Sequence, residues 1–358
     1  MLIYYILIFV PMLIPLARSK GVIRIGDKTT DQRNVVIVTF FSIYMTMLMM
    51  RGMDCGADTA IYHRHFETIN RYNIRDLIAL GITDLGHILL AKLVGFITTD
   101  SQIYIAVTAV LAVLPLLLFY RREAEIPLLT YLLFATVAPF SMYFSGVRQT
   151  LAMAFVVPAW YLAKSKTPIK FLLCVVAATL FHKSAFIIAV IYPLYHVRIT
   201  FKWLVVVLPV MAVVYVFNDR IFNFLTQFLW EDYGSAGSTG ATTVLLLLLI
   251  FAAYSFFVPD EKIMDDDVIA YRNLLLFAII LQCFAPLHPL AMRMNYYFLL
   301  FVPLLIPKIA NRSSSCNWRI RNISVLVMTV FFAVYFFYRA YADEDTLLLF
   351  PYIPFWES

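Results

Sequence analysis

Apolar runs close to the length of a membrane-spanning helix recur along the whole chain. Crossing the hydrocarbon core of a bilayer takes about 20 mostly apolar residues. Twelve runs approach that length: 2–17, 35–50, 102–120, 126–144, 147–163, 169–181, 184–197, 203–217, 241–258, 273–287, 294–310 and 323–338. Charged residues fill only 14% of the 358 positions, whereas soluble domains carry about a quarter. We therefore predict an all-α polytopic membrane protein, a single transmembrane domain over 1–358 with about 12 spanning helices.

The positions of the basic residues indicate which loops face the cytoplasm. Of the 28 Lys and Arg residues, 18 lie in alternate loops: 18–34, 121–125, 164–170, 198–202, 259–272 and 308–321. Cytoplasmic loops carry such an excess, so we assign these loops to the cytoplasm and both termini to the outer side. The net charge of +6 is then explained by the basic residues of the cytoplasmic loops, and we expect no nucleic-acid partner.

The segment 51–100 contains no run of spanning length, and we expect it to lie outside the membrane. The charge pattern is consistent only if 77–97 does not cross. Asp84, His87 and Lys92 recur in it at helix-compatible spacing, which suits an amphipathic helix lying in the outer interface. The sequence thus predicts short in-plane helices on the outer face.

Several patterns argue against other kinds of site. The four cysteines form no CxxC pair, so neither a disulfide framework nor a zinc site is indicated. Asp265 to Asp267, in the loop 259–272, are expected to be solvated because no further ligand residues surround them. No glycine-rich phosphate loop is present. We expect no metal and no cofactor. The run 2–17 lacks the basic start and the cleavage site of a signal peptide, so we expect a retained span.

Polar breaks interrupt the apolar runs on the outer side. They read SGVRQ, FHKSAF and PLHPLAMRMNYYF and contain Arg148, Gln149, His182, Lys183, His288 and Arg293. The segments that flank FHKSAF are about 20 Å long as helices, too short for a ~30 Å hydrocarbon core. The prolines of the third break interrupt a helix, and irregular backbone at that depth is tolerated where it lines a cavity or is buried in protein.

A fourth polar segment, RGMDCGADTAIYHRHF, opens the outer region and contains Arg51, Asp54, Asp58, Tyr62 and His65. On a helix, Asp58 and Tyr62 share a face because they are four residues apart. Four segments thus bring Arg, Lys, His and Asp to one membrane face. Buried cations without partners are costly, so such a set predicts a functional site.

Each residue alone also has a structural explanation. Arg148 could snorkel or bind the carbonyl end of a helix, Asp58 could cap the helix that follows it, and His182 with Lys183 could form an ordinary turn. His65 could be a solvated interface residue. It is the convergence of four segments that favours a site.

A cationic pocket open to the outer leaflet suits an anion attached to a lipid. Arginine binds phosphate oxygens in bidentate fashion, and lysine adds a point charge. A diphosphate leaving group needs that stabilisation as its bond breaks, and glycosyl transfer needs a base near the acceptor hydroxyl. Tyrosines flank the breaks and offer faces for sugar stacking, although an interfacial aromatic belt explains them equally well. They are Tyr62, Tyr143, Tyr296 and Tyr297.

These segments together resemble the EpsG-type family of Wzy-like membrane polysaccharide polymerases. The resemblance rests on RGMDCGADTAIYHRHF, SGVRQTLAMAF, FHKSAFIIAVIYPLY and RMNYYFLLFVP, in this order, and covers about 35 to 310. The family pattern has a tyrosine after the aspartate at Asp58, whereas Thr59 follows here. The resemblance implies an O-antigen or exopolysaccharide polymerase of the bacterial cytoplasmic (inner) membrane, with its site facing the periplasm or cell exterior. It also implies a multi-spanning, lipid-phosphosugar-dependent (GT-C-like) glycosyltransferase architecture.

The resemblance implies transfer of a growing glycan from undecaprenyl diphosphate to the next lipid-linked repeat unit, with membrane lipids and a separate chain-length regulator as further partners. Asp58, Arg148, Gln149, His182 and Arg293 occupy the motif positions. We predict catalytic roles for Asp58 as the base, with His65 or His182 as alternatives, and for Arg148 and His182 at the diphosphate. The residues predicted to bind substrate are Arg51, Asp54, Tyr62, His65, Tyr143, Gln149, Lys183, His288, Arg293 and Tyr297.

Two other functions remain open on the sequence. A flippase or transporter of the same lipid-linked oligosaccharide would place polar groups through the full depth of the membrane, whereas here they gather at one end. A membrane O-acyltransferase acting on glycans would place a histidine near the centre or the cytoplasmic face. Only His196 lies near the inner surface.

Overall fold

The computed structural model describes residues 1–16, 22–25, 28–137, 139–229, 241–258, 264–287, 289–312, 318–342 and 347–358. His288 and the first part of the loop 259–272 lie outside the described residues. The described chain is helical, apart from one hairpin between α1 and α2, in which Val22 pairs with Asp31 in an antiparallel register. With only this short hairpin beside the helices of the described chain, the predicted all-α class is confirmed.

In chain order, the helices and strands are α1 Leu2–Leu16, β1 Val22–Ile25, β2 Lys28–Asp31, α2 Gln32–Met50, α3 Thr59–Arg71, α4 Ile74–Ala79, α5 Leu85–Gly95, α6 Ser101–Glu123, α7 Pro127–Thr136, α8 Met142–Ser145, α9 Val147–Ala154, α10 Val156–Lys164, α11 Pro168–Phe181, η1 Lys183–Val190, α12 Ile191–His196, η2 Phe201–Trp203, α13 Leu204–Val216, α14 Asn218–Leu229, α15 Ala241–Phe257, α16 Asp266–Gln282, α17 Pro289–Leu299, α18 Val302–Asn311 and α19 Trp318–Tyr341. The elements η1 and η2 are 3₁₀ helices.

Every predicted apolar run coincides with helix, but several runs are broken. The run 147–163 divides into α9 and α10 just before Pro158, whose missing N–H and bulky ring disrupt a helix on their N-terminal side. The run 294–310 divides into α17 and α18, which meet at a bend of 41° with Pro303 in the first turn of α18.

Helices suited to a membrane are present in the described chain. Three are long and apolar enough to cross it by length and composition: Arg33–Met50, Ser101–Glu123 and Arg321–Tyr341. The bent pair α17 and α18 makes a fourth if it counts as one span, and six further apolar helices are shorter. Helix length therefore supports a membrane protein but does not establish the predicted count of about 12 spans.

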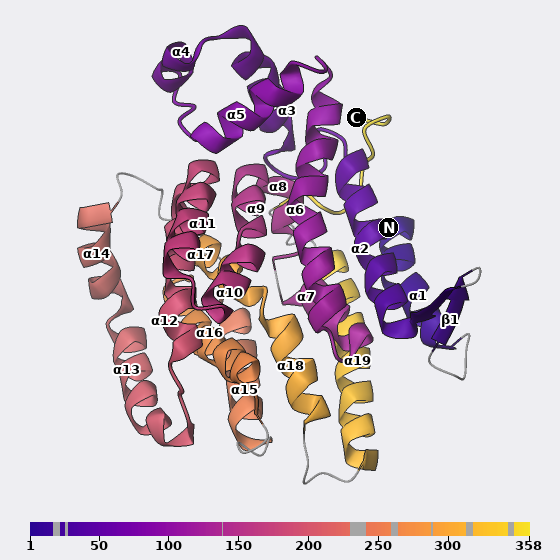
Figure 1. Ribbon diagram of the computed structural model, residues 1–358, viewed down its shortest axis with the longest axis vertical. Coiled ribbons are helices and arrows are strands. Elements are labelled where there is room, and N and C mark those ends of the chain that lie inside the picture. Colours follow the sequence, from indigo (N-terminus) through magenta and orange to yellow (C-terminus); the bar gives the residue numbers. More distant parts are fainter. Residues whose placement is uncertain are drawn as a thin grey trace.

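Most helices run roughly side by side along the long axis of the molecule, while α3, α4 and α5 lie across one end (Figure 1). We call these three helices, residues 59–95, the cap. The cap shares a hydrophobic core of its own with α6 and α9, separate from the main core of the bundle. Its buried members are Tyr62, Phe66, Ile69, Leu77, Ile82, Ile88, Ala91, Val94, Tyr104, Ile105, Val147 and Leu151.

The predicted amphipathic helix over 77–97 is in fact two short helices. α4 has 6 residues and α5 has 11, and 11 residues of helix span only about 16 Å. The polar residues expected to face water point inward instead, since Asp84 is 7% exposed and His87 is 0% exposed. The cap is thus docked on the bundle through polar contacts that an in-plane amphipathic helix would not make.

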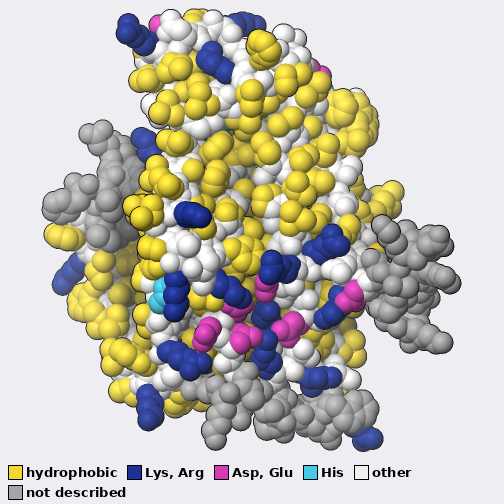
Figure 2. Space-filling model, in the orientation of Figure 1, with side chains coloured by type: hydrophobic (Ala, Val, Ile, Leu, Met, Phe, Trp, Pro, Cys, Tyr) yellow, Lys and Arg dark blue, Asp and Glu magenta, His cyan; other side chains and the backbone are white. Residues whose placement is uncertain are grey.

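The opposite end of the bundle, which we call the charged end, joins the loops predicted to be cytoplasmic. Figure 2 shows its Lys, Arg, Asp and Glu side chains gathered in a band across the lower half of the molecule. Lys308 binds Glu123 and Glu125 at 3.5 and 3.6 Å, and Arg312 binds Glu125 and Asp265 at 3.1 and 2.7 Å. These contacts connect the loops after α6 and α18 to the start of α16.

The three aspartates at the start of α16 were expected to be solvated, which holds for Asp265 and Asp266 but not for Asp267, whose side chain is only 15% exposed. Asp266 is 80% exposed. Asp265 caps α16 by accepting a hydrogen bond from the Val268 N–H at 2.9 Å, and Asp267 binds Lys164. An aspartate at the first turn of a helix is favoured by the helix dipole, and here two of the three also tie neighbouring loops together.

The C-terminal segment 347–358 crosses the cap end of the bundle (Figure 1). Its backbone pairs with the chain around the end of α2: the N–H of Gly52 donates to Ile353 at 2.9 Å, and the N–H of Gly56 donates to Leu348 at 2.9 Å. This segment therefore holds the turn that leads from α2 into α3.

Candidate functional site

Arg148 lies in the first turn of α9, immediately after the break at Gly146. Its Nη1 donates to Oδ2 of Asp84, and the two side chains are 31% and 7% exposed. Asp84 occupies the N-cap position of α5 but makes no capping hydrogen bond, although aspartate there normally accepts one from the helix. Its carboxylate is directed to Arg148 instead, so it joins the cap to the bundle.

Aromatic and imidazole side chains of the cap surround the same arginine. Tyr62 lies close enough to Arg148 to act on its charge, and the Tyr62 ring meets that of His65 edge-on, with the centroids 6.1 Å apart. The rings of His65 and His87 are also 6.1 Å apart. His87 Nδ1 shares a hydrogen bond of 2.8 Å with the Tyr104 hydroxyl.

These histidines are held neutral by their surroundings. Burial, followed by the positive charge of Arg148, lowers the pKa of His65. The same two causes, in the same order, lower the pKa of His87 to about 3. Burial penalises the charged imidazolium, and a nearby guanidinium adds repulsion. Both imidazoles are therefore neutral at pH 7 and able to accept a hydrogen bond.

Two further segments reach the same place. His182 ends α11 in an extended conformation, and the charges of Arg148 and Arg293 both act on its imidazole. Gln149 Nε2 donates to the backbone carbonyl of Arg293 at 2.6 Å, which joins α9 to α17. Tyr297, one turn further along α17, shares a hydrogen bond of 3.1 Å with Ser184. Arg148, His182 and Arg293 are thus brought together from α9, the α11–η1 junction and α17.

Several polar atoms around Arg148 are buried and have no hydrogen-bond partner among the residues that the structure describes. They are Arg148 Nε, Gln149 Oε1, His65 Nδ1 and His87 Nε2. Buried polar groups are paired in the great majority of cases. A donor and three potential acceptors left open beside one guanidinium are what a polar ligand or water would satisfy.

The other residues predicted from the sequence differ in their contacts and burial. Asp58 precedes α3, makes no side-chain cap, and donates its N–H to Ser145 at 3.2 Å, so it lies beside the α8–α9 break. Its predicted alternative, a simple helix cap, is not what the side chain does. Tyr143 is buried, and its hydroxyl has no hydrogen-bond partner in the described part of the chain. Asp54 and Lys183 are exposed.

Arg51 is the most deeply buried of the predicted cations. It is 1% exposed, its Nη1 donates to the Leu48 carbonyl at 3.0 Å, and its backbone forms a bridge with Pro354. The C-terminal segment thus covers it. His288 lies outside the described residues, so its predicted role stays a prediction.

Sequence reasoning did not select Asp84, His87 or Ser184. Asp84 precedes an apolar helix, a pattern that indicates an N-cap, and nothing local to it signals a partner 64 residues away. His87 was attributed to the polar face of an amphipathic helix. The neighbours Ile88 and Ala91 belong to the buried, apolar face of α5. Their proximity to His87 on the helix is a signal that could have predicted its burial.

Comparison with known proteins places the chain in a family. The model of the EpsG family matches residues 34–354, which includes all the polar segments described above and most of the C-terminal segment. No curated protein and no solved structure matches the chain.

Proposed function

The chain belongs to the EpsG family, and we propose that it polymerises a polysaccharide by transferring a growing glycan from a polyprenyl diphosphate to the next lipid-linked repeat unit. Family membership supports a polysaccharide polymerase-type role in general. The observation that supports the finer proposal is that the charges of Arg148 and Arg293 both act on the His182 imidazole, while Gln149 joins α9 to α17 through the Arg293 carbonyl.

Two arginines fit a diphosphate better than one. Within the described residues, Arg293 forms no ion pair and Arg148 Nε has no hydrogen-bond partner, although Arg148 Nη1 contacts Asp84. Guanidinium groups bind phosphate oxygens through two parallel hydrogen bonds. In this proposal they stabilise the charge that develops on the diphosphate as its bond to the glycan breaks, and the neutral His182 accepts or donates a hydrogen bond beside them.

The acceptor hydroxyl needs a base, and the two nearby aspartates differ in availability. The Asp84 carboxylate is committed to Arg148. The Asp58 carboxylate takes part in no ion pair among the described residues and is only half-buried. Asp58 therefore remains our candidate for the base, whereas Asp84 is a positioning residue.

The charge distribution supports an outer-face site. The charged end joins the loops that hold most of the Lys and Arg residues, and cytoplasmic loops carry that excess. The cap and the candidate site lie at the other end (Figure 1). We propose a cytoplasmic-membrane protein whose site faces outward, to the space in which lipid-linked repeat units are joined.

The test uses the purified protein in nanodiscs with lipid-linked repeat units and no nucleotide. The wild type should produce a ladder of extended glycans. Arg148→Ala should lower the rate by about 100-fold or more, the usual cost of removing a group that stabilises developing charge, and Arg148→Lys should restore only part of it because lysine lacks the planar fork. Arg75→Ala, at an exposed cap position, is the matched control.

Two results would count against this proposal. A normal ladder from Arg148→Ala would remove the arginine from the chemistry, and movement of the lipid-linked substrate across the bilayer without extension would favour a flippase. For Asp58, we expect Asn to abolish extension and Glu to retain part of it. Wild-type ladders from both substitutions would exclude Asp58 as the base.

A further inference from the structure

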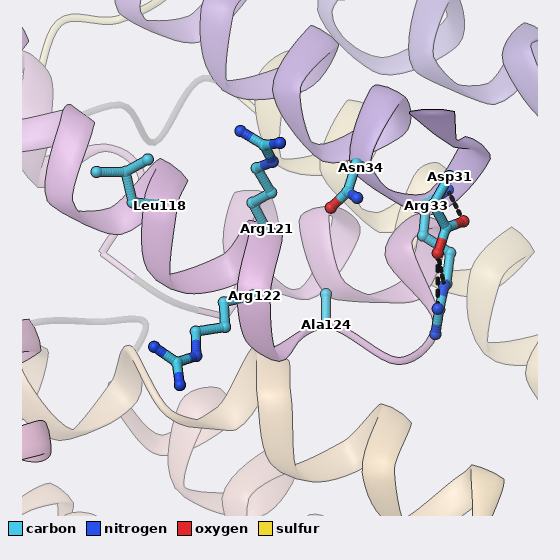
Figure 3. A pocket seen from close by; sticks show the side chains of 7 residues that line it. All are labelled: Asp31, Arg33, Asn34, Leu118, Arg121, Arg122 and Ala124. Atoms are coloured by element: carbon cyan, nitrogen blue, oxygen red, sulfur yellow. Dashed lines mark hydrogen bonds and ion pairs between the residues drawn. The ribbon is translucent and has the colours of Figure 1, made fainter. Parts of the chain in front are cut away.

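A cavity of about 460 Å³ lies at the charged end, far from the candidate site, between the start of α2 and the end of α6. Arg121 and Leu118 of α6 and Asn34 of α2 all line it (Figure 3). Three arginines and one aspartate line it. Nothing in the proposed transfer reaction uses this cavity.

The acidic groups near the cavity are already engaged. Asp31 is held by Arg33 through contacts of 2.7 Å to Nε and 2.6 Å to Nη2. Arg122 points away from Arg121 (Figure 3) and lies over the Tyr161 ring, 5.1 Å from its centroid. Arg121 has no acidic partner among the described residues. The cavity therefore retains a guanidinium free to bind an anion.

An apolar stripe leads from the cavity along α6. Leu111, Leu114 and Leu118 are 44%, 42% and 52% exposed, and their spacing of three and four residues places them on one helix face. Arg121 follows three residues later on that face. α6 is long and apolar enough to cross a membrane, so the stripe faces hydrocarbon and the arginine lies at its polar boundary.

We propose that this cavity binds the phosphate of an anionic phospholipid from the cytoplasmic leaflet, with an acyl chain along the leucine stripe. Arg121 and Asn34 bind the headgroup oxygens. Basic pockets between membrane helices on the cytoplasmic side are suited to such headgroups. Compensation of the helix dipole explains an arginine at the end of α6, but not a cavity beside it or the exposed stripe that runs into it. A free phosphate would use the arginine and not the stripe.

The experiment measures lipid retention by native mass spectrometry of the full-length protein. Phosphatidylglycerol, phosphatidylcholine and inorganic phosphate are titrated separately. Wild-type protein should retain phosphatidylglycerol over phosphatidylcholine, and Arg121→Gln should weaken phosphatidylglycerol binding about fivefold, the effect of about 1 kcal/mol per basic residue near an anionic surface. Lys170→Gln, an exposed cation at the same end, should have no effect.

A second variant separates lipid from soluble anion. Leu118→Gln should weaken phosphatidylglycerol binding because it interrupts the stripe, while any contact with inorganic phosphate is unchanged. Equal retention of the two phospholipids, or wild-type retention by Arg121→Gln, would overturn the proposal. Binding of inorganic phosphate as tight as that of phosphatidylglycerol would replace it with a soluble-anion site.

Discussion

Replacement of Asp84 by alanine tests whether this buried carboxylate positions Arg148. The two residues come from different layers, the cap and the bundle, and the Asp84 carboxylate is 7% exposed. In Asp84→Ala the guanidinium loses its anionic partner and keeps only its contact with Tyr62. We expect Arg148 to sample several rotamers, so that a productive contact with the substrate diphosphate forms less often.

The size of the effect follows from the burial of the pair. Removing one partner of a buried ion pair costs about 3–5 kcal/mol. Because Arg148 is 31% exposed, water takes over part of the lost contact, and we expect about 2 kcal/mol. If that energy is lost from the transition state, the rate of extension falls roughly 30-fold.

The assay is the initial rate of glycan extension in nanodiscs for the four members of a double-mutant cycle. Asp84→Ala, Arg148→Ala, the double variant and the wild type are compared at equal protein amounts. If Asp84 acts only through Arg148, the double variant should extend glycan no more slowly than Arg148→Ala. The cycle would then give a coupling energy of about 2 kcal/mol between the two residues. Asp84→Asn keeps a neutral acceptor and should be intermediate.

Two outcomes would refute this reasoning. Fully additive losses would show that Asp84 acts independently of the arginine. A wild-type rate for Asp84→Ala, with the protein folded, would show that the ion pair does not position Arg148.

Three further predictions concern stability, measured as thermal denaturation in detergent. Gly56 has a φ of +96°, and a Cβ there would meet backbone atoms, whereas Gly81 has a φ of +81° and open space around it. Gly56→Ala should therefore lower the free energy of unfolding by more than the roughly 1 kcal/mol expected of Gly81→Ala. Equal losses of stability in the two variants would contradict this. Burial lowers the pKa of His87 from 6.5 to about 3, so the unfolded chain binds more protons than the folded chain between these pH values. The free energy of unfolding should therefore fall as pH drops below about 6.5, by up to about 1.4 kcal/mol per pH unit. His87→Gln should flatten this dependence, and an unchanged slope would show that His87 is not its source. Lys308→Met removes the buried cation between Glu123 and Glu125, which keep only Arg122 and Arg312 as basic partners, and should cost about 2 kcal/mol. Arg198→Gln, whose ion pair is exposed, should change stability little, and similar losses for the two variants would contradict the burial of Lys308.

Local patterns were sufficient for the class of fold and the family. Apolar runs require helices in a membrane because the backbone must satisfy its hydrogen bonds internally, and the EpsG resemblance is confirmed by a family match over 34–354. The match extends beyond the predicted limit of about 310, and it includes most of the segment that covers Arg51.

The same patterns failed where a residue's role depends on a distant partner. Asp84 precedes an apolar helix and looks like an N-cap, and Asp265 to Asp267 look like a solvated loop. In the structure Asp84 binds Arg148, and Asp265 and Asp267 hold neighbouring loops. A carboxylate chooses between capping and ion pairing according to what is docked beside it, and local sequence does not contain that information.

Short-range composition was enough to predict apolar helices, the loops in which positive charge is concentrated, and the polar residues that stand among apolar neighbours. The packed fold was needed to show that Asp84 is the partner of Arg148, that the charges of Arg148 and Arg293 both act on His182, and that residues 347–358 cover the turn before α3. Those contacts join residues tens to hundreds of positions apart, and they exist because the cap and the C-terminal segment pack on one end of the bundle.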